Sequence, residues 1–166
     1  EFKGLSTYAT LSPLPGFTRW MRRELESDAS GLMTKDENDA LAEAFVTVDG
    51  EEALRRILDT TAWSADRALT DAAEPVLTGI AARYLLKAKN RRGRVADPVA
   101  HFHLTNGALV ERLNWMGDKS DHGVGQSAGM MVNYLYNLGR IEENHEAYTG
   151  EGRVMASSTV EKLARI

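Results

Sequence analysis

The sequence has no cysteine among its 166 residues, so it cannot form a disulfide, a thiolate metal site or a cysteine nucleophile. It also has no apolar run near the ~18 residues that a membrane-spanning helix needs, no signal peptide and no peroxisomal SKL ending. Basic residues are in the minority, because 20 Lys and Arg stand against 24 Asp and Glu, for a net charge of −4. General nucleic-acid binding needs a basic surface. We therefore expect no nucleic-acid partner, no membrane partner and a cytoplasmic location.

The composition is typical of a globular protein, with 43% hydrophobic and 27% charged residues. The length suits one domain or part of a larger one. The chain opens at Glu1 and runs at once into strand-like sequence. We therefore expect these residues to be part of a larger domain.

The first 25 residues predict a strand, a tight turn and a helix. The segment Leu5–Leu11 is rich in Thr, Tyr and Leu, which favour strands, and it leads into a turn marked by Pro13, Pro15 and Gly16. Apolar residues then recur at helical spacing from Phe17 to Leu25.

Helices are predicted over most of the next 80 residues. Residues 26–62 carry apolar stripes at helical spacing, and a longer helix is expected over 71–89 with Pro75 in its first turn. A short helix is expected between Asp97-Pro98, a favourable start, and Asn106-Gly107, a favourable stop. A run of cations ends the longer helix: Lys87, Lys89, Arg91, Arg92 and Arg94.

Two more strands are predicted in the last third of the chain, over 109–115 and 130–136, with a Gly/Ser loop over 118–129 between them. A capping box at Ser158–Glu161 predicts a last helix. The fold class is therefore mixed α/β (α+β), with a small central sheet and flanking helices. Three strands make a small sheet for this much helix, so we expect part of the sheet to lie outside these residues.

Four histidines are the first candidates for chemistry, but none has the spacing of a metal motif, and we expect no metal site. Histidine is the usual acid–base group near neutral pH. His101 and His103 are two residues apart, so a helix directs them to different faces. The pattern does not decide which of them faces inward. The remaining two are His122 and His145.

Ser12 stands at the end of the first predicted strand, where a hydroxyl is well placed to line a cleft. Serine is also common at such places as the cap of the following turn or helix, and the pattern alone favours that capping role. The sequence has no GxSxG motif, so a hydrolase triad is not indicated.

Two further motifs are weak as ligand sites. The basic run 87–94 could contact phosphates, but cations at a helix C-terminus are favoured by the helix dipole, and a solvated helix end is our interpretation. The glycine-rich segment 123–129 lacks the features of a P-loop or a Rossmann fingerprint. Five aromatic residues are expected in the core rather than on a binding platform, namely Trp20, Trp63, Trp115, Tyr134 and Tyr136.

Four groups of residues follow one another along nearly the whole chain. They are Thr10-Leu-Ser-Pro-Leu-Pro-Gly-Phe17 with Trp20; Asp97-Pro-Val-Ala-His-Phe-His-Leu-Thr-Asn-Gly-Ala108; Glu111-Arg-Leu-Asn-Trp-Met-Gly-Asp118 running into Gln126-Ser-Ala-Gly-Met-Met-Val-Asn-Tyr-Leu-Tyr136; and 147–154 with Ala156-Ser-Ser158. In this order they resemble the malonyl-CoA decarboxylase family. The helices predicted over 26–90 match the family only in pattern.

This resemblance implies a catalytic domain similar to the acetyltransferase superfamily called GNAT, with a helical domain before it. It implies a carbon–carbon lyase of fatty-acid metabolism that converts malonyl-CoA to acetyl-CoA and CO2. No metal or organic cofactor is implied, and CoA enters only as part of the substrate. The family's tendency to associate implies a homo-oligomer for the complete enzyme.

The resemblance also implies the site residues. The serine of the family's LSP motif corresponds to Ser12, and the histidine of its FHL motif corresponds to His103. A tyrosine of its NYxY motif is best matched by Tyr136. Loss of CO2 leaves a thioester enolate whose oxyanion needs positioned donors. We expect Ser12 to contact the malonyl carboxylate, His103 to donate a proton or hydrogen bond, and Tyr136 to orient one of them.

In the resembled family the loop that binds the CoA pyrophosphate precedes the LSP strand. Residues 1–166 would then be the C-terminal portion of the catalytic domain, without that loop or the helical N-terminal domain, and we expect no decarboxylation by this portion alone. Two alternatives stay open. One is a GNAT-type acyl-CoA transferase, and the other is a non-catalytic module for assembly or regulation.

Overall fold

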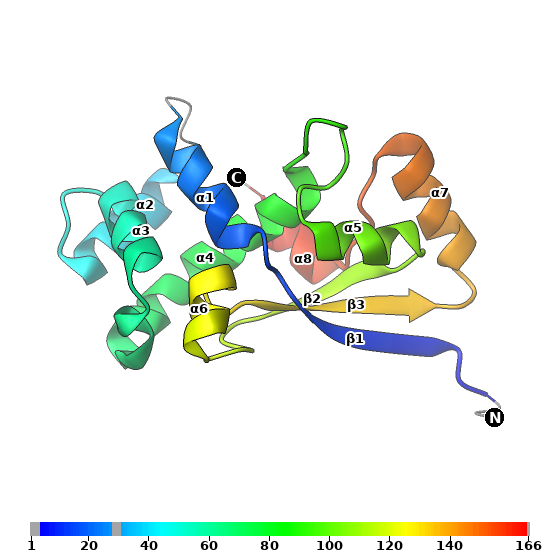
Figure 1. Cartoon of the computed structure of the whole chain (residues 1–166), viewed down its shortest axis with the longest axis horizontal. Coiled ribbons are helices and arrows are strands. Elements are labelled where there is room, and N and C mark those ends of the chain that lie inside the picture. Colours follow the sequence, from blue (N-terminus) through cyan, green and yellow to red (C-terminus); the bar gives the residue numbers. More distant parts are fainter. Residues whose placement is uncertain (1–3, 28–30, 166) are drawn as a thin grey trace.

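A three-stranded antiparallel sheet forms the lower side of the molecule in Figure 1. The computed structural model describes residues 4–27 and 31–165. Strand β3 (Met131–Asn137) is in the middle, between β1 (Thr7–Pro13) and β2 (Leu109–Asn114). The predicted mixed α/β class, with a small sheet and flanking helices, is confirmed.

The first unit has the predicted order of strand, turn and helix. Strand β1 begins two residues later than expected, and α1 (Phe17–Glu26) follows the proline-rich turn. The turn is closed by a hydrogen bond of 3.2 Å from the Phe17 amide to the Leu14 carbonyl oxygen. Leu14 and Phe17 are fully buried, so the turn is anchored in the core directly after Ser12.

Helices fill the middle of the chain, as expected, and three of them begin at side-chain caps on Thr34, Asp49 and Asp66. Residues 28–30 of the predicted helical stretch lie outside the described residues. The elements are α2 (Lys35–Phe45), α3 (Gly50–Asp59), the 3₁₀ helix η1 (Ala62–Ala65) and α4 (Arg67–Lys87).

The predicted start of the long helix is wrong. The Asp66 carboxylate accepts hydrogen bonds from the amides of Ala68 and Leu69, so α4 begins at Arg67 and Pro75 lies inside it rather than in its first turn. Pro75 is exposed. Only Lys87 of the basic run belongs to the helix, and residues 88–96 form a loop.

The last third contains two helices that were not predicted. Helix α6 (Asp121–Ser127) replaces the expected Gly/Ser loop, because Ser120 caps it and accepts a hydrogen bond from the Gly123 amide. Helix α7 (Ile141–Glu151) follows β3.

The two remaining helices were predicted. Helix α5 (Pro98–Thr105) begins after Asp97 as expected. Helix α8 (Ser158–Leu163) is capped by Ser157 rather than Ser158, and Val160 stands at N3, so the predicted helix is confirmed and the predicted capping box is wrong.

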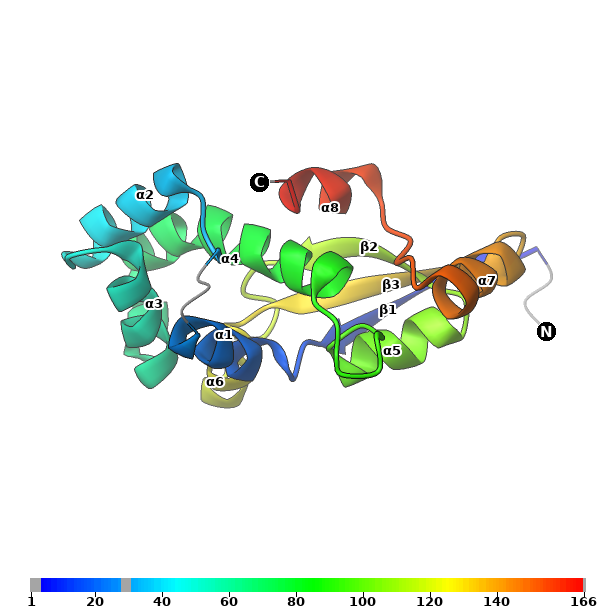
Figure 2. The same ribbon diagram turned by 90° about the horizontal axis from the view of Figure 1, so that it is seen from above.

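One face of the sheet is covered and the other is open. Helices α4, α5, α7 and α8 lie on the same side of the sheet in Figure 1, and Figure 2 shows the same arrangement from above. Val132 and Tyr134 on that side are fully buried, whereas Leu11 on the other side is 57% exposed. No helix within the described residues 4–27 and 31–165 is long and apolar enough to cross a membrane.

Candidate active site

Ser12 is the next-to-last residue of β1 and is paired with Val132 of β3, so its side chain points to the covered face. The residue is 5% exposed. Its Oγ lies 3.1 Å from Nε2 of His103 and 3.1 Å from Oγ1 of Thr10. The N-cap of α1 is Gly16. Ser12 therefore does not cap that helix, and the role that the residue pattern alone favoured is wrong.

His103 comes from α5 and is the inward-facing histidine of that helix, 8% exposed. Its ring stacks on Tyr134 with 4.3 Å between ring centroids. Its Nδ1 lies 2.6 Å from the Tyr136 hydroxyl, so Ser12, His103 and Tyr136 form one hydrogen-bonded chain. His101 faces away from this chain, and its Nδ1 lies 2.7 Å from the Tyr148 hydroxyl.

Burial sets the protonation states of His103 and Tyr136. It lowers the pKa of His103 below its usual 6.5, which favours the neutral imidazole near pH 7. It raises the pKa of Tyr136, which keeps the phenol protonated. A phenol is a stronger hydrogen-bond donor than a neutral imidazole N–H, so the 2.6 Å contact is best made by the Tyr136 hydroxyl donating to Nδ1. The proton of the imidazole is then on Nε2, which faces Ser12.

Asp97 joins the two segments that carry Ser12 and His103. Its Oδ1 accepts from the amides of Val99 (3.0 Å) and Ala100 (3.1 Å), which caps α5. Its Oδ2 accepts from the Gly16 amide at 3.1 Å and from the Tyr84 hydroxyl at 3.3 Å. Asp97 is fully buried. One carboxylate thus fixes the turn after Ser12 to the start of the helix that bears His103.

The surroundings of Asp97 are tightly packed. Burial raises the pKa of Asp97, while its four hydrogen bonds act in the opposite direction. Burial and the nearby Asp97 charge raise the pKa of Tyr84, so that phenol remains a donor. A Cβ on residue 16 would collide with the Tyr84 hydroxyl. The sequence indicated Asp97 only as a helix cap, because its contact with Gly16 spans 81 residues.

The other two histidines lie apart from the chain of Ser12, His103 and Tyr136. His122 is exposed on α6, and Nδ1 of His145 on α7 lies 2.6 Å from the Thr105 carbonyl oxygen. In the part of the chain that the structure describes, no three His, Asp or Glu side chains are grouped to hold a metal ion.

Known proteins with similar sequences share one description. The family model "Malonyl-CoA decarboxylase C-terminal domain" matches residues 1–166. "Malonyl-CoA decarboxylase, mitochondrial" of Anser anser anser is 38% identical over 162 residues, which are 94% of this chain and 32% of that protein. The protein of the same name from Rattus norvegicus is 38% identical over 169 residues, with 98% of this chain and 34% of that protein covered.

Solved structures agree with the sequence comparison. The crystal structure of malonyl-CoA decarboxylase from Rhodopseudomonas palustris matches with a TM-score of 0.81 and 44% identity, covering 95% of this chain and 33% of that one. The structure of the Agrobacterium vitis protein matches with a TM-score of 0.81 and 39% identity, covering 98% and 37%. The chain thus spans about a third of the length of these relatives.

Proposed function

The chain belongs to the malonyl-CoA decarboxylase C-terminal domain family, and from this membership we propose that it carries the catalytic groups of an enzyme that converts malonyl-CoA to acetyl-CoA and CO2. The observation that supports this most is the chain of hydrogen bonds from Ser12 through His103 to Tyr136. It combines a hydroxyl, an imidazole and a phenol at one buried place, which are groups suited to stabilising an anion and delivering a proton.

In this proposal Ser12 is the group that touches the substrate. Its hydroxyl donates to the malonyl carboxylate and holds it so that the breaking C–C bond overlaps with the thioester π system. The electrons of that bond move to the thioester carbonyl as CO2 leaves, which produces an enolate. Ser12 is able to donate because Nε2–H of His103 donates to its Oγ, leaving the Ser12 proton free for the substrate.

The enolate must then gain a proton at its α-carbon. Ser12 passes its hydroxyl proton to that carbon and recovers one from Nε2 of His103, while Nδ1 takes the hydroxyl proton of Tyr136, so that the imidazole stays neutral. Solvent then restores the proton of Tyr136, and one proton is consumed for each CO2 released. Tyr136 does not touch the substrate, and it holds the His103 ring and its tautomer between turnovers.

We further propose that residues 1–166 are the C-terminal portion of a GNAT-like catalytic domain whose upstream part completes the site. Two observations support this. The outer edge of β1 has no strand beside it in the described sheet, whose order is β1-β3-β2. Tyr8 and Leu11 on this strand are 45% and 57% exposed, and a preceding strand paired to this edge would cover part of them.

Other expectations from the sequence stay predictions. These are a reaction without cofactor, a homo-oligomeric complete enzyme and a cytoplasmic location. The goose and rat relatives carry the word mitochondrial in their names. A place in fatty-acid metabolism follows only if malonyl-CoA is the substrate.

The experiment that tests this function is an assay of the chain joined to its upstream sequence, with malonyl-CoA alone and with an added amine acceptor. The proposal expects CO2 and acetyl-CoA without the amine. Transfer of the acyl group to the amine would instead show an acyl-CoA transferase. Neither reaction, together with no thermal shift on adding malonyl-CoA or acetyl-CoA, would indicate a non-catalytic module.

A further inference from the structure

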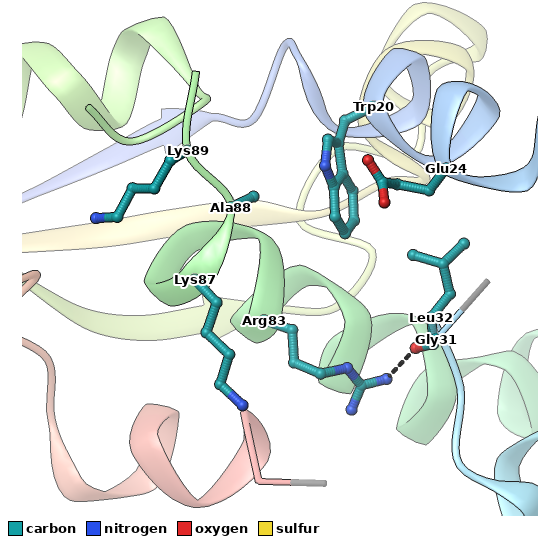
Figure 3. Close-up of a pocket in the computed structure, with 8 residues that line it drawn as sticks. All are labelled: Trp20, Glu24, Gly31, Leu32, Arg83, Lys87, Ala88 and Lys89. Carbon is teal, nitrogen blue, oxygen red and sulfur yellow. Dashed lines mark hydrogen bonds between the residues drawn. The ribbon is translucent and has the colours of Figure 1, made fainter. Parts of the chain in front are cut away.

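A cleft of about 640 Å³ lies between α1 and the loop 88–96, away from Ser12 and His103. Figure 1 shows this loop rising beside α1, and Figure 2 shows the two side by side from above. A second cavity of about 330 Å³ adjoins it and shares Trp20, Glu24 and Lys89 with it (Figure 3). The larger cleft is lined by Trp20, Arg23, Glu24, Lys89, Asn90, Arg91, Arg92 and Ala96.

The loop wall of the cleft is a closed turn. The Asn90 amide donates to the Arg94 carbonyl oxygen at 2.8 Å, and Asn90 Oδ1 accepts from the amides of Arg92 and Arg94. The Ala96 amide donates to the Ala88 carbonyl oxygen at 3.1 Å, so the base of the loop is closed as well. Arg91 and Arg92 are therefore held at the tip of a small hairpin.

Cations face the cleft from both walls. Arg23 projects from α1, and Arg91 and Arg92 project from the loop. In the described part of the chain none of these three has a carboxylate partner, whereas neighbouring Arg22 pairs with Asp59 at 3.2 Å. Glu24 is the one acidic residue of the lining. Like charges that face one another without partners repel, and an anion between them removes that repulsion.

The adjoining cavity is lined by other cations, namely Arg83, Lys87 and Lys89, and its one arginine is already paired. Arg83 there donates to the Leu32 carbonyl oxygen at 2.7 Å, as Figure 3 shows, and pairs with Glu37 at 3.1 Å. Lys89, which lines both cavities, donates to the Gly152 carbonyl oxygen at 2.8 Å. Among the described residues that line these two cavities, the arginines without a carboxylate partner therefore all belong to the larger cleft.

We propose that the larger cleft binds the phosphate-bearing nucleotide end of a CoA thioester, an inference that rests on the proposed function. Guanidinium groups match phosphate oxygens in a two-pronged geometry. Trp20 provides a half-buried ring for the base, and it is held from behind by Tyr84 at 4.9 Å between ring centroids. Helix α1 follows directly on the turn after Ser12, so the cleft and the reacting groups belong to one connected unit.

The test compares two substrates in the complete enzyme, namely malonyl-CoA and malonyl-pantetheine, which lacks the nucleotide. Arg23→Ala and Arg91→Ala should each raise KM for malonyl-CoA about tenfold, with kcat unchanged, because each removes one charged hydrogen bond to phosphate. KM for malonyl-pantetheine should not change. Arg112→Ala, which removes an exposed arginine of β2, is the control and should change neither. Equal effects on both substrates, or none, would overturn the proposal.

A binding measurement separates this proposal from the proposed function. Calorimetric titration with adenosine 3′,5′-bisphosphate should show binding by the unchanged protein and by Arg112→Ala, and about tenfold weaker binding by Arg23→Ala. Binding with this pattern but no turnover of malonyl-CoA would refute the decarboxylase activity and support the nucleotide cleft. Equal affinity in all three proteins would refute the cleft, whatever the activity.

Discussion

At the scale of single residues, Tyr136 decides which nitrogen of His103 carries the proton. Its hydroxyl is 2.6 Å from Nδ1, and the opposite nitrogen is 3.1 Å from Ser12 Oγ. While Tyr136 donates to Nδ1, the imidazole proton stays on Nε2 and faces Ser12. The other tautomer would leave Nε2 without a proton to give.

Replacing Tyr136 by phenylalanine should therefore lower kcat about tenfold through loss of the productive tautomer. Tyr134→Phe is the matched control. It keeps the ring that stacks on His103, and it removes a buried hydroxyl that has no hydrogen-bond partner among the described residues. Steady-state kinetics of the two variants checks this. Equal losses of kcat in both would contradict the assignment.

The pH dependence of kcat/KM should show an acidic limb with a midpoint below 6.5. Burial lowers the pKa of His103 from that value. In the proposed mechanism the neutral imidazole is the active form, so activity should fall as the pH drops through the lowered pKa. Asp97, whose pKa is raised by burial, also titrates on the acidic side. The profile is therefore measured for Asp97→Asn as well, and a limb that persists there belongs to His103. Activity that instead falls as the pH rises through this range would show that the imidazolium is the active form.

At the scale of elements, the geometry of the site depends on how β1 and its turn meet α5. Asp97 holds that junction, with one carboxylate oxygen on each side of it. Gly16 is the contact point on the turn, and no larger residue fits there. Asp97 thus acts as a positioning residue for Ser12 and His103.

Asp97→Asn should lower kcat about tenfold and leave KM nearly unchanged. Asparagine caps a helix about as well as aspartate, but its amide would present a donor to the Gly16 N–H. Asp66→Asn, which alters the equivalent cap of α4, should leave kcat unchanged. Kinetics and thermal melting of both variants are compared. Loss of stability in Asp97→Asn without loss of kcat would show a purely structural role.

The elements that the sequence predicted are those with strong local signals. Pro13, Pro15 and Gly16 end β1, and Asp97-Pro98 starts α5. Helix α6 was missed because its glycines predict a loop, whereas in the structure a Cβ on Gly123 would collide with the Asp118 side chain. That helix packs on α1, where Thr18 donates to the Gly125 carbonyl oxygen at 2.8 Å. Such tertiary contacts are not visible in local sequence.

The residues of the site, like the helices and strands, were predicted only in part. Residue types and spacing did not separate His103 from His101, and they favoured a capping role for Ser12. The family resemblance selected Ser12, His103 and Tyr136, and the structure places these three in one hydrogen-bonded chain. Two features depend on the fold and have no signal in the spacing of residues along the sequence. One is the hydrogen bond from the Gly16 amide to Asp97, and the other is the grouping of arginines from α1 and the loop 88–96.

At the scale of the whole molecule, the chain spans about a third of the length of its relatives, and one edge of β1 has no strand beside it within residues 4–27 and 31–165. We expect the chain alone to release no CO2 from malonyl-CoA. The chain joined to its upstream sequence should do so, because the proposal places the rest of the catalytic site there. Assays of both proteins at equal concentration check this. Full activity of the chain alone would contradict the proposed division of the domain.

The most direct test of the central claim is the rate of CO2 release from malonyl-CoA by the complete protein and three variants. Ser12→Ala and His103→Ala should each lower turnover at least ~100-fold, as expected for groups that stabilise charge and move protons. His101→Ala, on the same helix but bonded to Tyr148, should keep nearly full turnover. Near-normal turnover in Ser12→Ala or His103→Ala would contradict the account.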